Sequence, residues 1–134
     1  MAPSESETEI RRLEARPGCT TEIQLEFGDL DKAQIERVVI ILKKNQNIKS
    51  VVFTDSTIGK DNVNLIVKIL NETAITTLNI SNCNIMPDEG VKIGKALQNN
   101  KFLEKLVISY NRIGDNAIKE IATALKTSTK LNNY

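Results

Sequence analysis

Apolar residues recur along this chain with a period of 27 or 28 residues. Three stretches share the pattern L-x-x-L-x-L in apolar terms, and they begin at Ile48, Ile75 and Leu103. A weaker copy around Ile23 and Leu25 precedes them. Alternating apolar and polar positions are typical of a short strand that buries one face. We therefore predict strands near residues 22–26, 50–54, 77–81 and 105–109.

A second apolar set lies between these strands at the helical spacing i, i+3, i+4, i+7. Three expected stripes are Ile35, Val38, Val39 and Leu42; Val63, Ile66, Val67 and Leu70; and Ile118, Ile121, Ala122 and Leu125. The third in chain order is poorer, with Val91, Gly94 and Leu97 and with Ile93 beside them. Pro87 and the pair Gly114-Asp115 mark two helix starts. Ile40 and Leu65 fall off the stripes, and we expect Ile40 to pack beneath a further helix at the N-terminal end.

One strand–helix unit cannot bury both of its apolar faces alone, so the units must stack. The pattern predicts an α/β solenoid of about four repeats, a short right-handed horseshoe segment with a parallel concave sheet. Its expected divisions are a disordered tail at 1–5, a cap helix and loop at 6–19 that begins with a capping box at Ser6, and a repeat domain at 20–134. The repeats span about 20–47, 48–74, 75–102 and 103–130, with a truncated fifth at 131–134.

Composition narrows the range of possible functions. The 134 residues include 18 basic and 17 acidic side chains, so no overall charge attracts nucleic acid or an anionic membrane. The chain has no His, which is the commonest general base and neutral metal ligand. Its two cysteines, Cys19 and Cys83, form no C-x-x-C pair, and we expect a reducing, cytoplasmic setting. No nucleophile–base pair, metal cluster or phosphate loop is visible, so we expect no enzyme activity, no metal and no cofactor.

The stretch from Leu103 to Leu125 resembles the ribonuclease-inhibitor-type leucine-rich repeat, which also occurs in NOD-like receptors and Ran GTPase-activating proteins. The stretch from Leu42 to Ser50 is similar to repeats of the tropomodulin family. In such repeats an Asn or Cys bonds the backbone of the turn that leaves the strand. The resemblance places Cys83 and Asn111 at that position, whereas Gly28 and Ser56 depart from it.

Strand periodicity sends one set of side chains to the concave face and the adjoining rim. The candidate partner-binding residues are Glu22, Gln24, Glu26, Phe27, Val52, Thr54, Asp55, Asn79, Asn82, Lys105, Val107, Tyr110 and Arg112. This surface changes from acidic in the first repeat to basic in the last. An exposed aromatic beside an arginine, as at Tyr110 and Arg112, is typical of an interface anchor.

These features favour a non-enzymatic module that binds a protein partner, as an adaptor, inhibitor or effector, and neither nucleic acid nor a membrane. Two alternatives stay open from the resemblances. One is a cytoskeletal role of the tropomodulin kind, through actin. The other is an accessory to GTP hydrolysis, for which Arg112 is the one sensible charge donor on the rim. The truncated repeat around Leu131 and Tyr134 also predicts self-association through the C-terminal edge.

Overall fold

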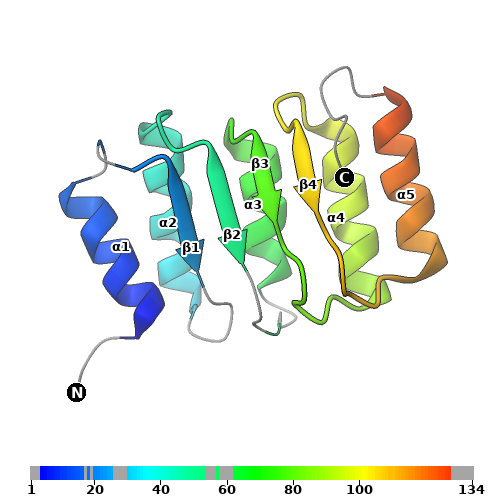
Figure 1. The fold of residues 1–134 in the computed structure, drawn as a ribbon, viewed down its shortest axis with the longest axis horizontal. Coiled ribbons are helices and arrows are strands. Elements are labelled where there is room, and N and C mark those ends of the chain that lie inside the picture. Colours follow the sequence, from blue (N-terminus) through cyan, green and yellow to red (C-terminus); the bar gives the residue numbers. More distant parts are fainter. Residues whose placement is uncertain are drawn as a thin grey trace.

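The computed structural model describes residues 4–16, 18, 20–25, 30–53, 57 and 62–127. Within these residues four strands alternate with five helices in one row, with the strands in one layer and the helices in another (Figure 1). In chain order the elements are α1 (Glu5–Ala15), β1 (Glu22–Leu25), α2 (Lys32–Lys44), β2 (Ser50–Phe53), α3 (Val63–Glu72), β3 (Thr77–Asn79), α4 (Pro87–Asn99), β4 (Lys105–Val107) and α5 (Gly114–Thr127). The predicted α/β solenoid with an N-terminal helix is confirmed.

The strands pair in parallel in the order β1-β2-β3-β4. Their register aligns the residues that the repeat predicts to be equivalent: Ile23 pairs with Val51, Val51 with Leu78, and Leu78 with Leu106. All four of these side chains are fully buried beneath the helices. The apolar alternation therefore determines which face of the sheet meets the core.

Helix starts follow local chemistry. Asp31 caps α2 through a capping box with Gln34, in which each side chain bonds the other residue's backbone N–H. Pro87 opens α4 and Gly114 opens α5, as predicted. The capping box expected at Ser6 is wrong, because Ser4 caps α1 by accepting a bond of 3.1 Å from the Glu7 N–H. Ser6 is instead buried in the helix.

Two of the predicted helix stripes need correction. Leu65, placed off the stripe of α3, is fully buried. Its equivalent 28 residues earlier is Arg37, which contacts α1, so this side of each helix faces the preceding helix. Ile118, placed on the stripe of α5, is 53% exposed, and Ala117 and Ala124 are buried in its stead.

The helix α1 covers the first repeat. Its Ile10 and Leu13 side chains are fully buried and close the N-terminal end of the core. The expectation that Ile40 packs beneath this helix is wrong, since Ile40 remains 49% exposed. It lines a shallow groove beside Leu13 and Glu14, because Ile10 and Leu13 already fill the space under α1.

Candidate functional site

The sheet face away from the helices is the predicted concave surface, and we call it the strand face. Its described positions come from aligned residues of the four strands, with Glu22 beside Ser50, Ser50 beside Thr77, and Thr77 beside Lys105. The side chain of Ser50 donates a 2.9 Å hydrogen bond to the Glu22 carboxylate, which links the first two strands. The row therefore begins at an acid and ends at Lys105, a cation.

The structure shows how exposed to solvent most of the predicted binding residues are. Six are exposed, namely Glu22, Gln24, Asn82, Lys105, Tyr110 and Arg112. Three are partly buried, namely Val52, Asn79 and Val107. Four, namely Glu26, Phe27, Thr54 and Asp55, lie outside the described residues. The repeat register brings Gln24, Val52, Asn79 and Val107 into one row across the sheet.

The turn after β4 presents Tyr110 to solvent. Its side chain is 87% exposed, more than any other large apolar residue described, and its backbone has φ 58°. Asn82, 28 residues earlier, has φ 53°. Asparagine tolerates this left-handed conformation, whereas a bulky side chain there is an outlier. The last repeat thus exposes an aromatic ring on a residue whose left-handed backbone conformation costs free energy. The preceding repeat avoids that cost because it has asparagine at the equivalent position.

The turn that carries Tyr110 is held by Asn111. The Asn111 side-chain oxygen accepts bonds of 3.0 Å from the N–H groups of both Cys83 and Ile85. Its amide nitrogen donates to the carbonyls of Ile80 and Ile108 at 2.8 and 3.0 Å. One side chain therefore joins the turns of two successive repeats and orients the rim beside Tyr110.

Cys83 occupies the equivalent position one repeat earlier. Its thiol is buried and lies 3.1 Å from the carbonyl oxygen of Phe53, to which it donates. A thiol that bonds a carbonyl in the core is a structural group, since reactive cysteines are partly exposed and beside positive charge.

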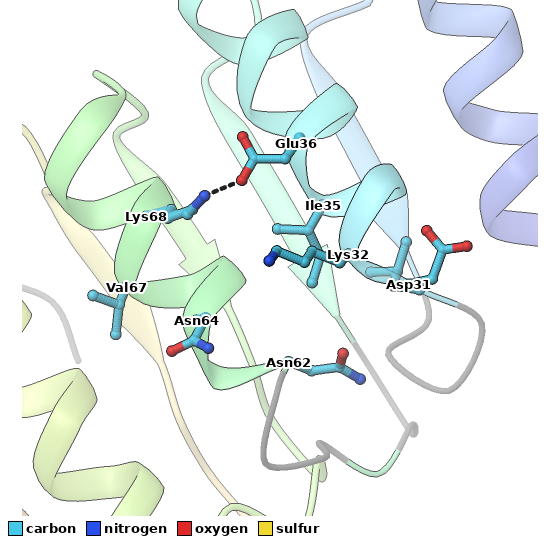
Figure 2. Close-up of a pocket in the computed structure, with 9 residues that line it drawn as sticks. Asp31, Lys32, Ile35, Glu36, Asn62, Asn64, Val67 and Lys68 are labelled. Atoms are coloured by element: carbon cyan, nitrogen blue, oxygen red, sulfur yellow. Dashed lines mark hydrogen bonds and ion pairs between the residues drawn. The ribbon is translucent and has the colours of Figure 1, made fainter.

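The helical face carries shallow grooves between neighbouring helices. One of these grooves, about 690 Å³, lies between α2 and α3 (Figure 2). An ion pair between Glu36 on α2 and Lys68 on α3 crosses from one helix to the other. This pairing lowers the pKa of Glu36 and raises the pKa of Lys68. The opposite charges of Glu36 and Lys68 in this groove therefore neutralise each other. Among all the described residues, no buried side-chain nitrogen or oxygen lacks a hydrogen-bond partner.

A second charged cluster ties α1 to α2. The Arg37 guanidinium bonds Glu7 at 2.8 Å and Glu14 at 2.6 Å. Bonds from Arg37, and then from Gln34 and Arg11, lower the pKa of Glu7 from 4.5 to about 2. Glu14 also has a lowered pKa, chiefly through its bond to Arg37. Such mutual pairing is a docking contact between helices and leaves no free charge for chemistry.

The described part of the chain offers little else for a ligand. No group of three or more His, Cys, Asp or Glu side chains gathers there in a way that suits a metal ion. None of its helices combines the length and the apolar character that crossing a bilayer requires. The arrangement of exposed residues on the strand face and its rim is therefore the best candidate for a functional surface.

Parallel strand–helix units of 27 or 28 residues, with an asparagine that joins successive turns, define a leucine-rich-repeat protein, and this chain is one. A family model described as Leucine Rich repeat matches residues 99–122. The mouse protein "NACHT, LRR and PYD domains-containing protein 5" is 30% identical over 102 residues, 75% of this chain. The chain spans only 9% of the length of that relative.

Two solved structures share the fold. The structure titled "Leiomodin-1 Actin-Binding Site 2 (ABS2)" matches with a TM-score of 0.79 and 24% identity, over 98% of this chain and 79% of the other. The Caenorhabditis elegans tropomodulin C-terminal domain matches with a TM-score of 0.52 and 12% identity, over 92% and 93% of the two chains. At these identities the likeness concerns the fold alone, and at that level it confirms the predicted resemblance to tropomodulin repeats.

Sequence reasoning missed two groups that the structure brings forward. One is the Arg37 cluster that docks α1, whose partners lie 23 and 30 residues away in sequence. The other is the outer side of α5, where Ile118 is exposed. The repeat offset of 28 contained a signal for this second group. It aligns Ile118 with Gly90, where α4 packs against the next helix, and so places Ile118 on the side of α5 that faces away from α4.

Proposed function

We propose that this chain is a non-enzymatic protein-binding module that engages its partner through the strand face and the adjoining rim. The observation that carries the proposal is Tyr110, an 87% exposed aromatic held in a left-handed backbone conformation. Backbone strain persists where the surrounding structure enforces it, and such sites concentrate at functional surfaces. Tyrosine is also among the residues that dominate binding energy at protein interfaces.

The neighbouring residues support the same surface. Arg112 is exposed two residues further on, and Val107 lies on β4, partly buried. An aromatic, a guanidinium and a half-buried apolar group within one short stretch of chain have the composition of an interface centre. Partner residues of negative charge suit the end of the strand face that carries Lys105 and Arg112, and basic ones suit the Glu22 end. The buried thiol of Cys83 fits our proposal of a cytoplasmic setting.

The experiment compares three forms of the chain as bait in an affinity capture. The rim variant carries Tyr110→Ala and Arg112→Ala, and the control carries Lys95→Ala and Asn99→Ala, two exposed positions on the helical face. We expect wild type and control to retain the same protein and the rim variant to lose it. For the purified pair, the affinity of the rim variant should fall about 30-fold, which corresponds to a hot-spot loss of about 2 kcal/mol. Equal affinity of all three forms would refute the proposal.

Actin is the second candidate partner. The solved structure with a TM-score of 0.79 bears a title that names an actin-binding site, and the match covers 98% of this chain. Co-sedimentation with actin filaments and pointed-end growth assays test this candidate directly. No effect at micromolar concentrations of the chain would exclude it, whereas a change in the rate of GTP hydrolysis by a partner GTPase, lost in Arg112→Ala, would favour the accessory role instead.

A further inference from the structure

The helix α5 presents an apolar strip on the side turned away from α4. Its inner side packs closely on α4, because a Cβ on Gly90 would lie 2.8 Å from the Ala117 Cβ. On the outer side, Ile118 is 53% exposed, Ala122 is exposed and Leu125 is partly buried. These three residues are spaced at i, i+4 and i+7, which places them on one side of the helix. No described element follows α5 in the row (Figure 1).

The repeat identifies this strip as a helix-packing surface. Subtracting 28 from Ile118 and Ala122 gives Gly90 and Gly94, the positions at which α4 receives α5. In α4 both positions are glycines that let the next helix approach closely. In α5 the larger isoleucine makes that close approach impossible at one point. A helix that packs there needs a small residue opposite Ile118.

A second copy of the same helix meets that requirement when it runs antiparallel. A two-fold axis near residue 120 sets Ile118 opposite Ala122 of the partner, and Ala122 opposite Ile118, so that each large side chain meets a small one. The same axis brings Asp115, near the start of the helix, within one residue of the position opposite Lys126, near its end. Both are exposed. Self-complementarity of this kind is what a two-fold interface demands.

We propose that two copies of the chain associate through the outer side of α5, in an antiparallel helix pair centred on Ile118 and Ala122. The proposal is independent of the strand-face function, because α5 belongs to the helical layer. A helix of 14 residues is about 21 Å long and about 10 Å wide. Such a contact is well below the ~800 Å² per partner of a stable complex, so we expect a weak dimer with a dissociation constant on the order of 100 µM.

Sedimentation velocity of the whole chain from about 10 to 500 µM tests the proposal. The test variant is Ile118→Lys and the matched control is Ile40→Lys, since Ile40 is 49% exposed on α2 and equivalent residues in later repeats include Lys68. Wild type and Ile40→Lys should change from monomer to dimer as the concentration rises, and Ile118→Lys should stay monomeric, with affinity lowered at least tenfold. Thermal unfolding verifies that each variant is folded.

A charge exchange tests the antiparallel geometry without changing the apolar strip. Lys126→Glu alone should weaken the dimer, because it sets a glutamate near Asp115 of the partner. The double change Asp115→Lys and Lys126→Glu should restore it.

A wild-type monomer at every concentration, an Ile118→Lys dimer as stable as wild type, or oligomers that grow beyond two copies would each overturn the proposal. Binding of a strand-face partner that depends on Tyr110 and Arg112 should not respond to Ile118→Lys, which separates the two surfaces.

Discussion

Replacing Asn111 with alanine should be among the most damaging single changes to this fold. Its side-chain oxygen accepts from the N–H groups of Cys83 and Ile85, and both of these residues are fully buried. Its amide nitrogen donates to the carbonyls of Ile80 and Ile108. Alanine offers none of these bonds, and the vacated position is only partly open to water.

The size of the effect follows from the two donors that lose their acceptor. Each buried polar group left without a partner costs about 1–3 kcal/mol. Because Asn111 is only partly buried, water satisfies part of this loss, and we expect the free energy of unfolding to fall by about 3 kcal/mol. For 134 residues the unfolding entropy is about 0.28 kcal/mol/K, which converts this loss to a decrease of about 10 °C in Tm.

Two assays together test this reasoning. Calorimetry gives the change in Tm, and hydrogen exchange followed by NMR reports on the Cys83 and Ile85 amides, which should lose protection in Asn111→Ala. Asn116→Ala is the matched control, because Asn116 is exposed on α5 and alanine favours a helix. A Tm within 2 °C of wild type (about 0.6 kcal/mol by the same conversion), with both amides still protected, would show that the bridge between turns contributes little.

Three further changes test other contacts. Tyr110→Asn should raise the free energy of unfolding by about 1 kcal/mol in denaturant titration, since asparagine accepts the left-handed conformation, while partner affinity falls. Gly94→Ala should cost about 1–3 kcal/mol by overpacking, because its Cβ would lie 2.7 Å from the nearest α5 atom, whereas Gly18→Ala, with open space around it, should be neutral. Glu7→Gln should lower Tm at pH 7. The folded-state pKa of Glu7, about 2, lies below 4.5, so its contribution is present above pH 4.5 and disappears as the pH falls toward 2; the variant's acid denaturation curve should be flatter in that window.

The strands were predictable because their signal is local. Buried and exposed residues alternate within four or five positions, so Val51 and Phe53 alone indicate which face of β2 meets the core. Strands β3 and β4 end two residues earlier than expected, although the buried Ile80 still donates its backbone N–H to the Val107 carbonyl of β4. The expected last residues of β1 and β2 lie outside the described residues. The predicted rows of exposed residues follow from the same alternation, which is why so much of the candidate surface could be derived.

The helices and the rim depend on information that the alternation lacks. The apolar stripe of a helix indicates which of its residues can be buried. Which of them are in fact buried depends on the helices that pack on each side. Leu65 is buried because α3 has a helix before and after it, and Ile118 is exposed because no described helix follows α5. The left-handed backbone at Tyr110 has no sequence signal of its own, since tyrosine is not a residue that favours it.

The interactions between neighbouring helices change in kind along the row. Ion pairs cross from α1 to α2 through Arg37 and from α2 to α3 through Glu36 and Lys43. Between α4 and α5 the contact depends instead on close packing at Gly90 and Gly94, and no ion pair joins these two helices within the described residues. In a solenoid each unit depends on its nearest neighbours, so stability varies along the stack. Acid and salt should therefore destabilise the packing of α1 before that of the other helices. The rim at Tyr110 and the outer side of α5 lie in the half of the molecule whose stability those conditions affect least.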